Sequence, residues 1–272
     1  REAIEKIKQK YGAEGVLSWL DKAKDLTALV VGEAITDEYV FVTPEGKSSK
    51  ESLVCFREVG REKWKGGANI VASHIGQLCH VEIKENHPIT KTRFLLEPFK
   101  TKLFHYVDSE KVAPLSSEIV YRGDMVAVAD FGHGAISKEF VLEVSSWPVF
   151  VALTVQSNSL NYGYNLLKKW PKADYVVCDA EELRLNYGDK ETPLFALAQR
   201  ERERFGAKLL AVTQGHKGCL VVSSTEIVEF PALAEKVVDT MGAGDAFLGI
   251  TAPLACAGAP ADVIAFVGSV AS

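Results

Sequence analysis

A glycine-rich turn that leads to a single carboxylate is the stretch of this chain best suited to chemistry. It reads Asp239-Thr240-Met241-Gly242-Ala243-Gly244-Asp245-Ala246-Phe247. Gly242 and Gly244 let the backbone turn several N–H groups toward one point, and the dipole of the helix expected next favours an anion there. Asp245 would stand beside that anion and could accept the proton of an attacking hydroxyl group. The alternative is an ordinary helix start, because Asp is a favoured capping residue.

Polar side chains also follow several apolar runs that we interpret as strands. Asp37 comes shortly after the first such run, Asp130 ends a later one, and Gln156 follows the next. Open parallel sheets bind ligands at the carboxyl ends of their strands. We therefore expect Asp37 and Asp130 to accept hydrogen bonds from sugar hydroxyls, and Gln156 to orient a sugar or phosphate oxygen. For Gln156 and the Ser and Asn residues after it, a simple turn before a helix near Leu160 is an equal alternative.

Strand-like and helix-like segments alternate along most of the chain. Short apolar runs occupy residues 26–31, 125–130, 149–155, 174–178 and 209–213. Segments of helical spacing or length occupy residues 1–24, 160–170 and 192–205. This alternation predicts an α/β fold with a mostly parallel central sheet flanked by helices.

Two regions depart from that rhythm. Residues 34–60 and 90–108 alternate apolar and polar side chains, which is typical of half-exposed antiparallel strands. They predict a small sheet that projects as a lid. Arg93 lies in the second region and suits a bidentate grip on a sugar phosphate, although a solvent-facing charge is equally plausible.

The turn at 239–247 matches every fixed position of D-T-x-G-A-G-D-A-F, and so resembles the signature of the PfkB or ribokinase-like carbohydrate kinases. The resemblance implies a ribokinase-like fold over a single domain of residues 1–272, with a β-strand lid that can mediate homodimer contact. It implies Asp245 as the catalytic base, the amides of Gly242, Ala243 and Gly244 as an anion hole, and ATP and Mg²⁺ as cofactors.

Other segments resemble further motifs of the same family. By that resemblance the paired glycines would approach the sugar, and Asn69 stands one residue before the position of the family's sugar-binding Asn. Glu182 would organise Mg²⁺ and phosphate, and Asp179 occupies the position where the family has Asn. A T-x-G-x-x-G element would contact the nucleotide. The residues implied are Gly66, Gly67 and Asn69 for the sugar, Glu182 for the metal, and Thr213, Gly215 and Gly218 for the nucleotide.

Within the family the chain is most similar to the heptose kinase branch, on Gly32–Tyr39, the Lys-Thr-Arg-Phe segment and Asp-Phe-Gly-His-Gly. This implies a sugar or sugar phosphate, foremost a heptose phosphate, as substrate and a nucleotidyltransferase partner domain in the full-length protein. Another hexose, pentose or nucleoside kinase is the first alternative. A catalytically weak sugar or nucleotide sensor is the second.

Composition limits the other classes of function. With 272 residues and 47% hydrophobic content the chain can build one sizeable core, and a net charge of -5 without basic runs argues against nucleic acid as a partner. Five scattered cysteines indicate a reduced, cytoplasmic protein, and no apolar stretch has the length of a membrane span. The chain lacks an initiator Met and stops within an apolar stretch, so we expect residues beyond Ser272. A Walker A loop, a dinucleotide-binding G-x-G-x-x-G after the first strand and a G-x-S-x-G elbow are all absent.

Overall fold

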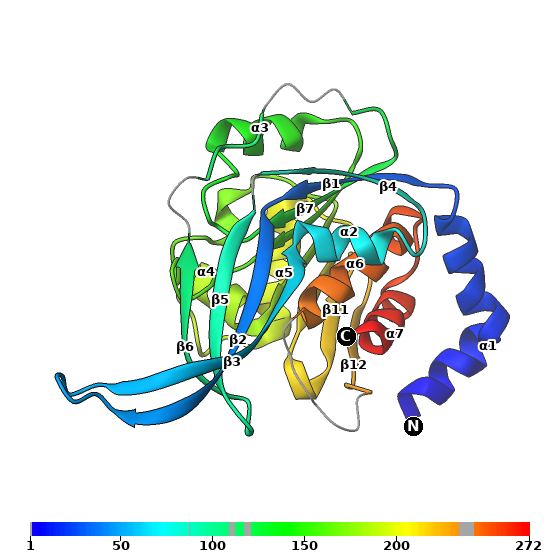
Figure 1. Cartoon of the computed structure of the whole chain (residues 1–272). Helices are drawn as coiled ribbons and strands as arrows, with labels where there is room; N and C mark the ends of the chain where they lie inside the picture. Colours follow the sequence, from blue (N-terminus) through cyan, green and yellow to red (C-terminus); the bar gives the residue numbers. More distant parts are fainter. Residues whose placement is uncertain (1, 87, 109–111, 117–120, 234–241) are drawn as a thin grey trace.

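The main body is built on one large sheet. The computed structural model describes residues 2–86, 88–108, 112–116, 121–233 and 242–272 (Figure 1). In these parts the sheet order is β12-β11-β10-β9-β8-β7-β1-β4. Neighbouring strands from β10 to β4 pair in parallel, whereas β11 and β12 are added antiparallel. The strands are β1 Thr27–Gly32, β4 His80–Glu85, β7 Met125–Asp130, β8 Phe150–Val155, β9 Tyr175–Asp179, β10 Leu209–Thr213, β11 Cys219–Val222 and β12 Ile227–Phe230.

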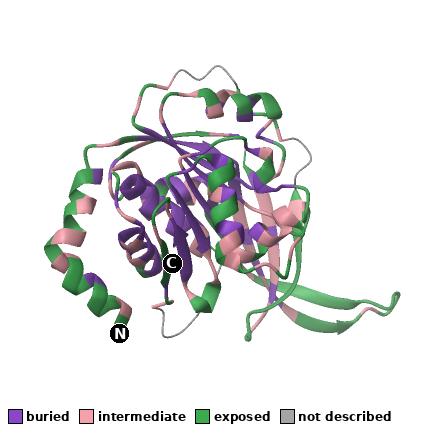
Figure 2. Ribbon diagram, turned by 180° about the vertical axis from the view of Figure 1, so that it is seen from behind, coloured by how far each residue is buried: buried purple, intermediate pink, exposed green. Residues whose placement is uncertain are grey.

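Helices cover both faces of this sheet, and alternate strand residues pack against each set. Val30 belongs to one hydrophobic cluster, whereas its neighbours Leu29 and Val31 belong to the other. Every residue of β7 and β8 is buried, as Figure 2 shows by the purple strands at the centre. The first cluster is completed by α1 Glu2–Ala23, α2 Ala68–Ile75, α6 Ala243–Cys256 and α7 Ala261–Ala271, and the second by α3 Lys138–Ser146, α4 Ala180–Tyr187 and α5 Leu194–Phe205. The predicted mostly parallel α/β architecture is confirmed.

The helix predicted over residues 160–170 is wrong. Only a short 3-10 helix, η1 Leu167–Lys169, forms there. The reason is competition from side-chain hydrogen bonds: the amides of Asn161 and Asn165 donate to backbone carbonyls of residues 130–132. Gly163 also takes a positive φ of 79°, which breaks helical geometry.

The second sheet forms the lid. Its order is β3-β2-β5-β6, from β2 Ala34–Lys47, β3 Val54–Gly67, β5 Ile89–Leu96 and β6 Thr101–Asp108. Figure 1 shows the β2–β3 hairpin projecting from the body, and Figure 2 shows most of it exposed. The predicted antiparallel arrangement holds for the outer pairs, but β2 and β5 pair in parallel. Between β2 and β5 the chain passes through β3, α2 and β4, and such a crossover returns a strand in the same direction.

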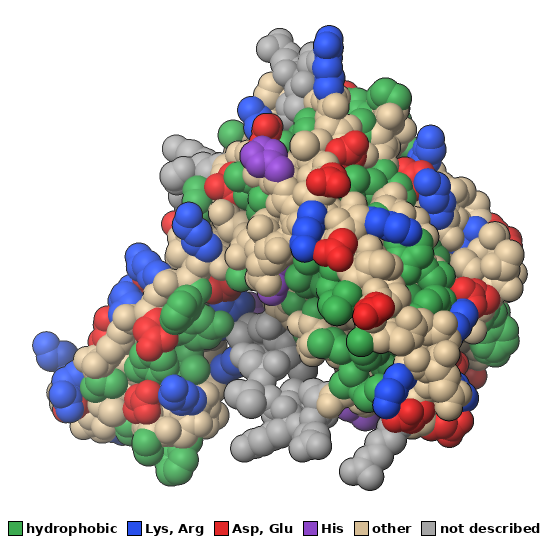
Figure 3. All heavy atoms as spheres, turned by 90° about the vertical axis from the view of Figure 1, so that its right-hand side faces the viewer, with side chains coloured by type: hydrophobic (Ala, Val, Ile, Leu, Met, Phe, Trp, Pro, Cys, Tyr) green, Lys and Arg blue, Asp and Glu red, His purple; other side chains and the backbone are tan. Residues whose placement is uncertain are grey.

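The surface shows no broad area of one charge on the face drawn in Figure 3, where basic and acidic side chains are interspersed among the described residues. None of the helices in the described parts combines the length and apolar character needed to cross a membrane.

Gly67 joins the lid to the body. Its φ is +61°, and a Cβ on it would collide with the carbonyl oxygen of Glu33. That oxygen also accepts a hydrogen bond from the backbone N of Ala68 at 2.9 Å. The end of β3 therefore presses directly on the junction between β1 and β2, and only glycine fits both the conformation and the space.

Replacing Gly67 tests this junction. We expect Gly67→Ala to lower the free energy of unfolding by about 1–3 kcal/mol, through backbone strain and the collision with Glu33. Gly60→Ala, on the same strand, is the matched control: its Cβ would meet the Phe41 ring at an ordinary 3.6 Å. Urea denaturation should show a change within about 0.5 kcal/mol for the control. Equal midpoints for the two variants would contradict the proposed role of Gly67.

Candidate active site

The polar segments predicted to follow strands do share one edge of the main sheet. In the parallel register Gly32 pairs with Ala129, Asp130 with Val155, and Thr213 with Asp179. The carboxyl ends of these strands therefore lie side by side. This edge receives the start of α6 and the root of the lid, as the contacts below show.

Asp245 lies in the first turn of α6 and is nearly buried, with 8% of its surface exposed. Its Oδ1 accepts a hydrogen bond of 2.9 Å from Nε2 of Gln156. Burial raises the pKa of Asp245 to about 7, against the opposing effects of the Gln156 hydrogen bond and the charge of Lys91. A carboxyl group with such a pKa changes its protonation near neutral pH, as a general base requires.

The glycine turn in front of Asp245 is open. Gly242 has a φ of +79°, and a Cβ placed on Gly242 or Gly244 would meet no other described part of the chain within 4 Å. Among the described residues, no side chain caps the helix that begins at Ala243. The Asp245 carboxylate accepts its hydrogen bond from Gln156 and not from a backbone N–H of the first helical turn, so the structure does not support the capping alternative. The motif residues Asp239, Thr240 and Met241 lie outside the described residues.

Asp37, Gly66 and Arg93 meet at the root of the lid. Nη1 of Arg93 forms a close ion pair with Oδ1 of Asp37. A Cβ on Gly66 would collide with the other oxygen of Asp37, so the first of the paired glycines makes room for this carboxylate. Arg93 is therefore turned toward the predicted sugar site and is not a solvent-facing charge.

Lys91 is a residue of this site to which the sequence reasoning gave no role. It faces Asp37 across the β2–β5 pair, and its charge acts on both Asp37 and Asp245. Burial lowers the pKa of Lys91. The sequence could have indicated Lys91 as a site residue, because residues two apart in a strand point to the same face and Lys91 lies two residues before Arg93.

A cavity of about 380 Å³ opens between the lid and the edge of the main sheet. Its described lining contains no acidic residue, and its charged or titratable members are Lys91, Arg93, Lys102, His105 and His133. Nε2 of His133 is buried and finds no partner in the parts of the chain that the structure describes. Burial lowers the pKa of His133 to about 4, so the ring is neutral. A cationic lining with an unpaired buried nitrogen fits an anionic ligand.

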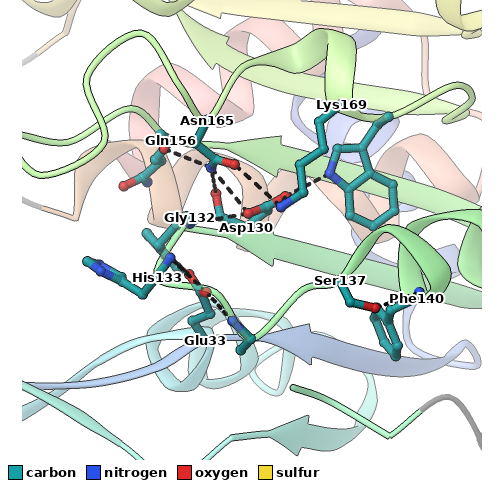
Figure 4. A network of polar contacts seen from close by, with 12 residues as sticks. Glu33, Asp130, Gly132, His133, Ser137, Phe140, Gln156, Asn165 and Lys169 are labelled. Atoms are coloured by element: carbon teal, nitrogen blue, oxygen red, sulfur yellow. Dashed lines mark hydrogen bonds and ion pairs between the residues drawn. The ribbon is translucent and has the colours of Figure 1, made fainter. Parts of the chain in front are cut away.

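Asp130 is not brought to the rim as predicted. It is fully buried, and both its oxygens are engaged (Figure 4). Oδ2 accepts a hydrogen bond of 2.8 Å from Nε1 of Trp170 and pairs with Nζ of Lys169 at 2.7 Å. Oδ1 accepts from Nδ2 of Asn165 and the backbone N of Gly132, each at 3.2 Å. We correct the prediction: Asp130 anchors a buried network and is not free to bind a sugar.

Glu33 is a second buried carboxylate that the sequence reasoning missed. It is fully buried between β1 and β2, and accepts backbone hydrogen bonds of 2.8 Å from His133 and 3.0 Å from Ala135 (Figure 4). Burial raises the pKa of Glu33. The only signal was a charged residue within an otherwise apolar stretch. Glu33 fixes the turn that carries His133 into the cavity.

Glu182 lies at the same edge, between the ends of β8 and β9. Its oxygens accept backbone hydrogen bonds from Ser157 at 3.0 Å and from Asp179 at 2.9 Å. Asp179 caps α4, because its side chain accepts a hydrogen bond of 2.7 Å from the backbone N of Glu182. Burial, with the neighbouring Asp179, raises the pKa of Glu182 to about 8. The described residues contain no group of three metal-ligating side chains. Because Mg²⁺ keeps several waters and binds mainly nucleotide phosphates, these two carboxylates fit a water-mediated role.

The remaining predicted residues are placed as follows. The side-chain amide of Asn69 donates to Glu85, at the end of the edge strand β4. Thr213 ends β10, and Gly215 begins a short 3-10 helix with open space around it. A Cβ on Gly218 would collide with the carbonyl oxygen of Phe230. Gly218 therefore serves the packing of β11 against the end of β12.

Comparisons with known proteins find similarity to part of the sequence and to most of the fold. Residues 153–272 match the profile of the pfkB family carbohydrate kinases. An ATP-dependent 6-phosphofructokinase of Thermoanaerobacterium thermosaccharolyticum is 26% identical over 189 residues, covering 62% of this chain and 57% of that protein. The bifunctional protein HldE of Rhodopseudomonas palustris is 27% identical over 191 residues, covering 64% of this chain and 38% of that protein. The chain thus spans about half or less of the length of these curated relatives.

Solved structures show the same architecture over most of the chain. The ribokinase of Thermotoga maritima superposes with a TM-score of 0.68 at 18% identity, covering 90% of each chain. At that identity the likeness concerns the fold, which is ribokinase-like. Residues 153–272, which carry the Asp245 turn at the edge of the sheet, are thus similar to the pfkB family carbohydrate kinases.

Proposed function

We propose that this protein transfers the terminal phosphoryl group of ATP to a hydroxyl group of a sugar, with Asp245 as the catalytic base. The observation that carries the proposal is the place of Asp245, nearly buried beside an open glycine turn at the start of α6. A base and an anion-binding helix end are thereby joined in one element. The ATP-dependent relative and the family match support the same reaction class.

The proposed mechanism assigns a role to each described part. Asp245 takes the proton of the acceptor hydroxyl, while the backbone N–H groups at Gly242, Ala243 and Gly244 stabilise the charge on the transferred phosphoryl group. Lys91 favours the charged form of Asp245 through its own positive charge. Magnesium bound to the nucleotide would neutralise phosphate charge, with Glu182 and Asp179 placed to hold its waters. Thr213 and Gly215 are the proposed nucleotide contacts.

Within that reaction we propose a sugar phosphate as acceptor. The lid cavity is lined by Lys91, Arg93 and Lys102, with Arg93 paired to Asp37 at the lid root, and this cationic lining suits a phosphate already present on the sugar. Asp37, Gly66 and Gly67 at the lid root would bind the sugar itself, with Asn69 beyond them. The relative named for 6-phosphofructokinase supports this class. A heptose phosphate, which the resemblance to the heptose kinase branch implies, is our leading candidate within it.

Other readings of the same site have their own support. Proteins named fructokinase also match, so an unphosphorylated hexose is the main alternative substrate. Pentose and nucleoside acceptors, and a sensor that binds without turnover, stay open as weaker alternatives. The predicted nucleotidyltransferase partner domain also stays a prediction.

A homodimer through the lid is part of the proposal. The outer strand β3 exposes several large apolar side chains, namely Val54, Phe56, Val59 and Trp64. Such side chains on a projecting hairpin would be buried by a second copy of the lid.

The role of Asp245 is tested by Asp245→Asn. Because the amide cannot accept the proton, we expect kcat to fall about 10²–10⁴-fold while ATP and sugar phosphate still bind. Coupled assays of nucleotide depletion measure turnover, and calorimetry measures binding. If the variant binds both substrates and turns over as fast as an active unaltered protein, Asp245 is not the base. If the unaltered protein binds both substrates without turnover, the kinase proposal fails.

The pH dependence of the reaction follows from the same carboxyl group. Asp245 must be deprotonated to accept a proton, so kcat/KM should fall below its pKa of about 7. The loss should approach about tenfold per pH unit on the acidic side. His133, with a pKa lowered to about 4, does not titrate in this range, whereas Glu182, with a pKa raised to about 8, does. A kcat/KM that stays constant from neutral pH down to about pH 5, with stability intact, would contradict the assignment.

The phosphate subsite is tested by Lys91→Met. Loss of one charge-assisted contact should raise KM for the sugar phosphate about 10- to 100-fold. KM for ATP should stay within about twofold, since a change in one subsite leaves the other's contacts intact. Lys50→Met is the matched control, because Lys50 is exposed in the same lid. Steady-state kinetics with a phosphorylated sugar and its unphosphorylated form should show the KM effect only for the former; equal effects on both would remove the phosphate subsite.

A further inference from the structure

The end of β8 is fixed on both sides by hydrogen bonds to its backbone. The N of Gln156 donates to the carbonyl oxygen of Asp130 at 2.8 Å, which extends the pairing of β7 and β8 by one residue. The carbonyl oxygen of Gln156 accepts a hydrogen bond of 3.1 Å from Nδ2 of Asn165. The backbone from which the Gln156 side chain projects is therefore held in one place.

The Asn165 amide acts as a clamp across the two strand ends. Its Nδ2 also donates to the carbonyl oxygen of Asp130 at 3.1 Å, and Asn165 itself is only 6% exposed. Figure 4 shows Asn165 between Gln156 and Asp130, with Lys169 reaching both Asn165 and the Asp130 carboxylate. The buried ion pair of Asp130 with Lys169 anchors the clamp. Removing one partner of such a buried pair is costly, so the arrangement resists displacement.

The side chain of Gln156 reaches from this clamp to Asp245. Its Nε2 donates a hydrogen bond of 2.9 Å to Oδ1 of Asp245. The other oxygen, Oδ2, has no hydrogen-bond partner among the residues that the structure describes. One oxygen is thus held by a fixed donor, and the other is left for an incoming hydroxyl group.

We propose that Gln156 is the positioning residue of Asp245, and that the Asn165 clamp exists to hold Gln156 for that purpose. The inference rests on the proposed kinase function. It replaces the sequence-based expectation that Gln156 contacts the substrate, and it explains why a polar network is buried behind the site. Gln156 acts through Asp245 and does not itself touch the reacting atoms.

The charged groups around Asp245 set the background for a test. Lys91 on β5 favours the charged form of Asp245, whereas Asp37 on β2 opposes it, and Glu182 on α4 is within electrostatic reach. The Gln156 donor favours the charged form without carrying a charge itself. Loss of the donor alone should therefore raise the pKa of Asp245, and a carboxylate in its place should raise that pKa further.

Two variants at one position give an ordered expectation. Gln156→Leu keeps the size but removes the donor: kcat should fall about 10- to 100-fold with KM for ATP unchanged. The acidic limb of kcat/KM should move to higher pH by about one unit. Gln156→Glu should move the limb further in the same direction. Gln199→Leu and Gln199→Glu, on the exposed face of α5, are matched controls that should leave the profile in place.

Thermal denaturation of each variant completes the experiment, together with a carbon-13 titration of the Asp245 carboxyl group. The carboxyl signal is assigned with Asp245→Asn. The proposal is overturned if the acidic limb and the Asp245 titration stay in place in both Gln156 variants, even if kcat falls. A merely structural side chain would lower kcat without moving either of them. A protein without phosphoryl transfer would instead overturn the proposed function. The carboxyl titration needs no turnover, so it still decides whether Gln156 controls Asp245.

Discussion

Burial of the Asp245 carboxyl group at the start of α6 is the constraint on which the site depends. Burial raises the pKa of this group, yet the proposed base must be charged when a hydroxyl arrives. The structure meets this need with a neutral donor from Gln156 and a nearby cation, Lys91. Both come from elements far from α6 in sequence. The end of β8 and the lid strand β5 must therefore be in place before the turn can act.

The two sheets divide the work of the site. The main sheet aligns strand ends into an edge that carries Gln156 and Glu182, and its helices bury both faces so that this edge is rigid. The lid contributes the cations and Asp37. Gly66 and Gly67 lie where the two meet, since any larger side chain there would strike Asp37 or the backbone of Glu33. The polar network around Asp130 lies behind this edge and holds it from within.

Much of the fold was predictable because its signals are local. The apolar runs that became β1, β7, β8, β9 and β10 are short and buried, and each is closed by polar or glycine residues. Where prediction failed, a distant contact decided the outcome. The segment 160–170 has helical length, but Asn161 and Asn165 bond the backbone beyond β7. The direction of β5 relative to β2 depended on the intervening crossover, which alternation of side chains cannot reveal.

For the site, the sequence by itself determined the glycine turn, the carboxylate of Asp245 and the similarity of residues 153–272 to the pfkB family, because a tight anion-binding turn needs those residues in consecutive positions. Only the tertiary structure decided what surrounds that turn. Asp37 and Asp130 look equivalent in sequence, as carboxylates at or shortly after a strand end. One pairs with Arg93 at the lid, and the other pairs with Lys169 in the interior. Which cation meets a carboxylate depends on how distant strands and loops pack, and no local pattern records that.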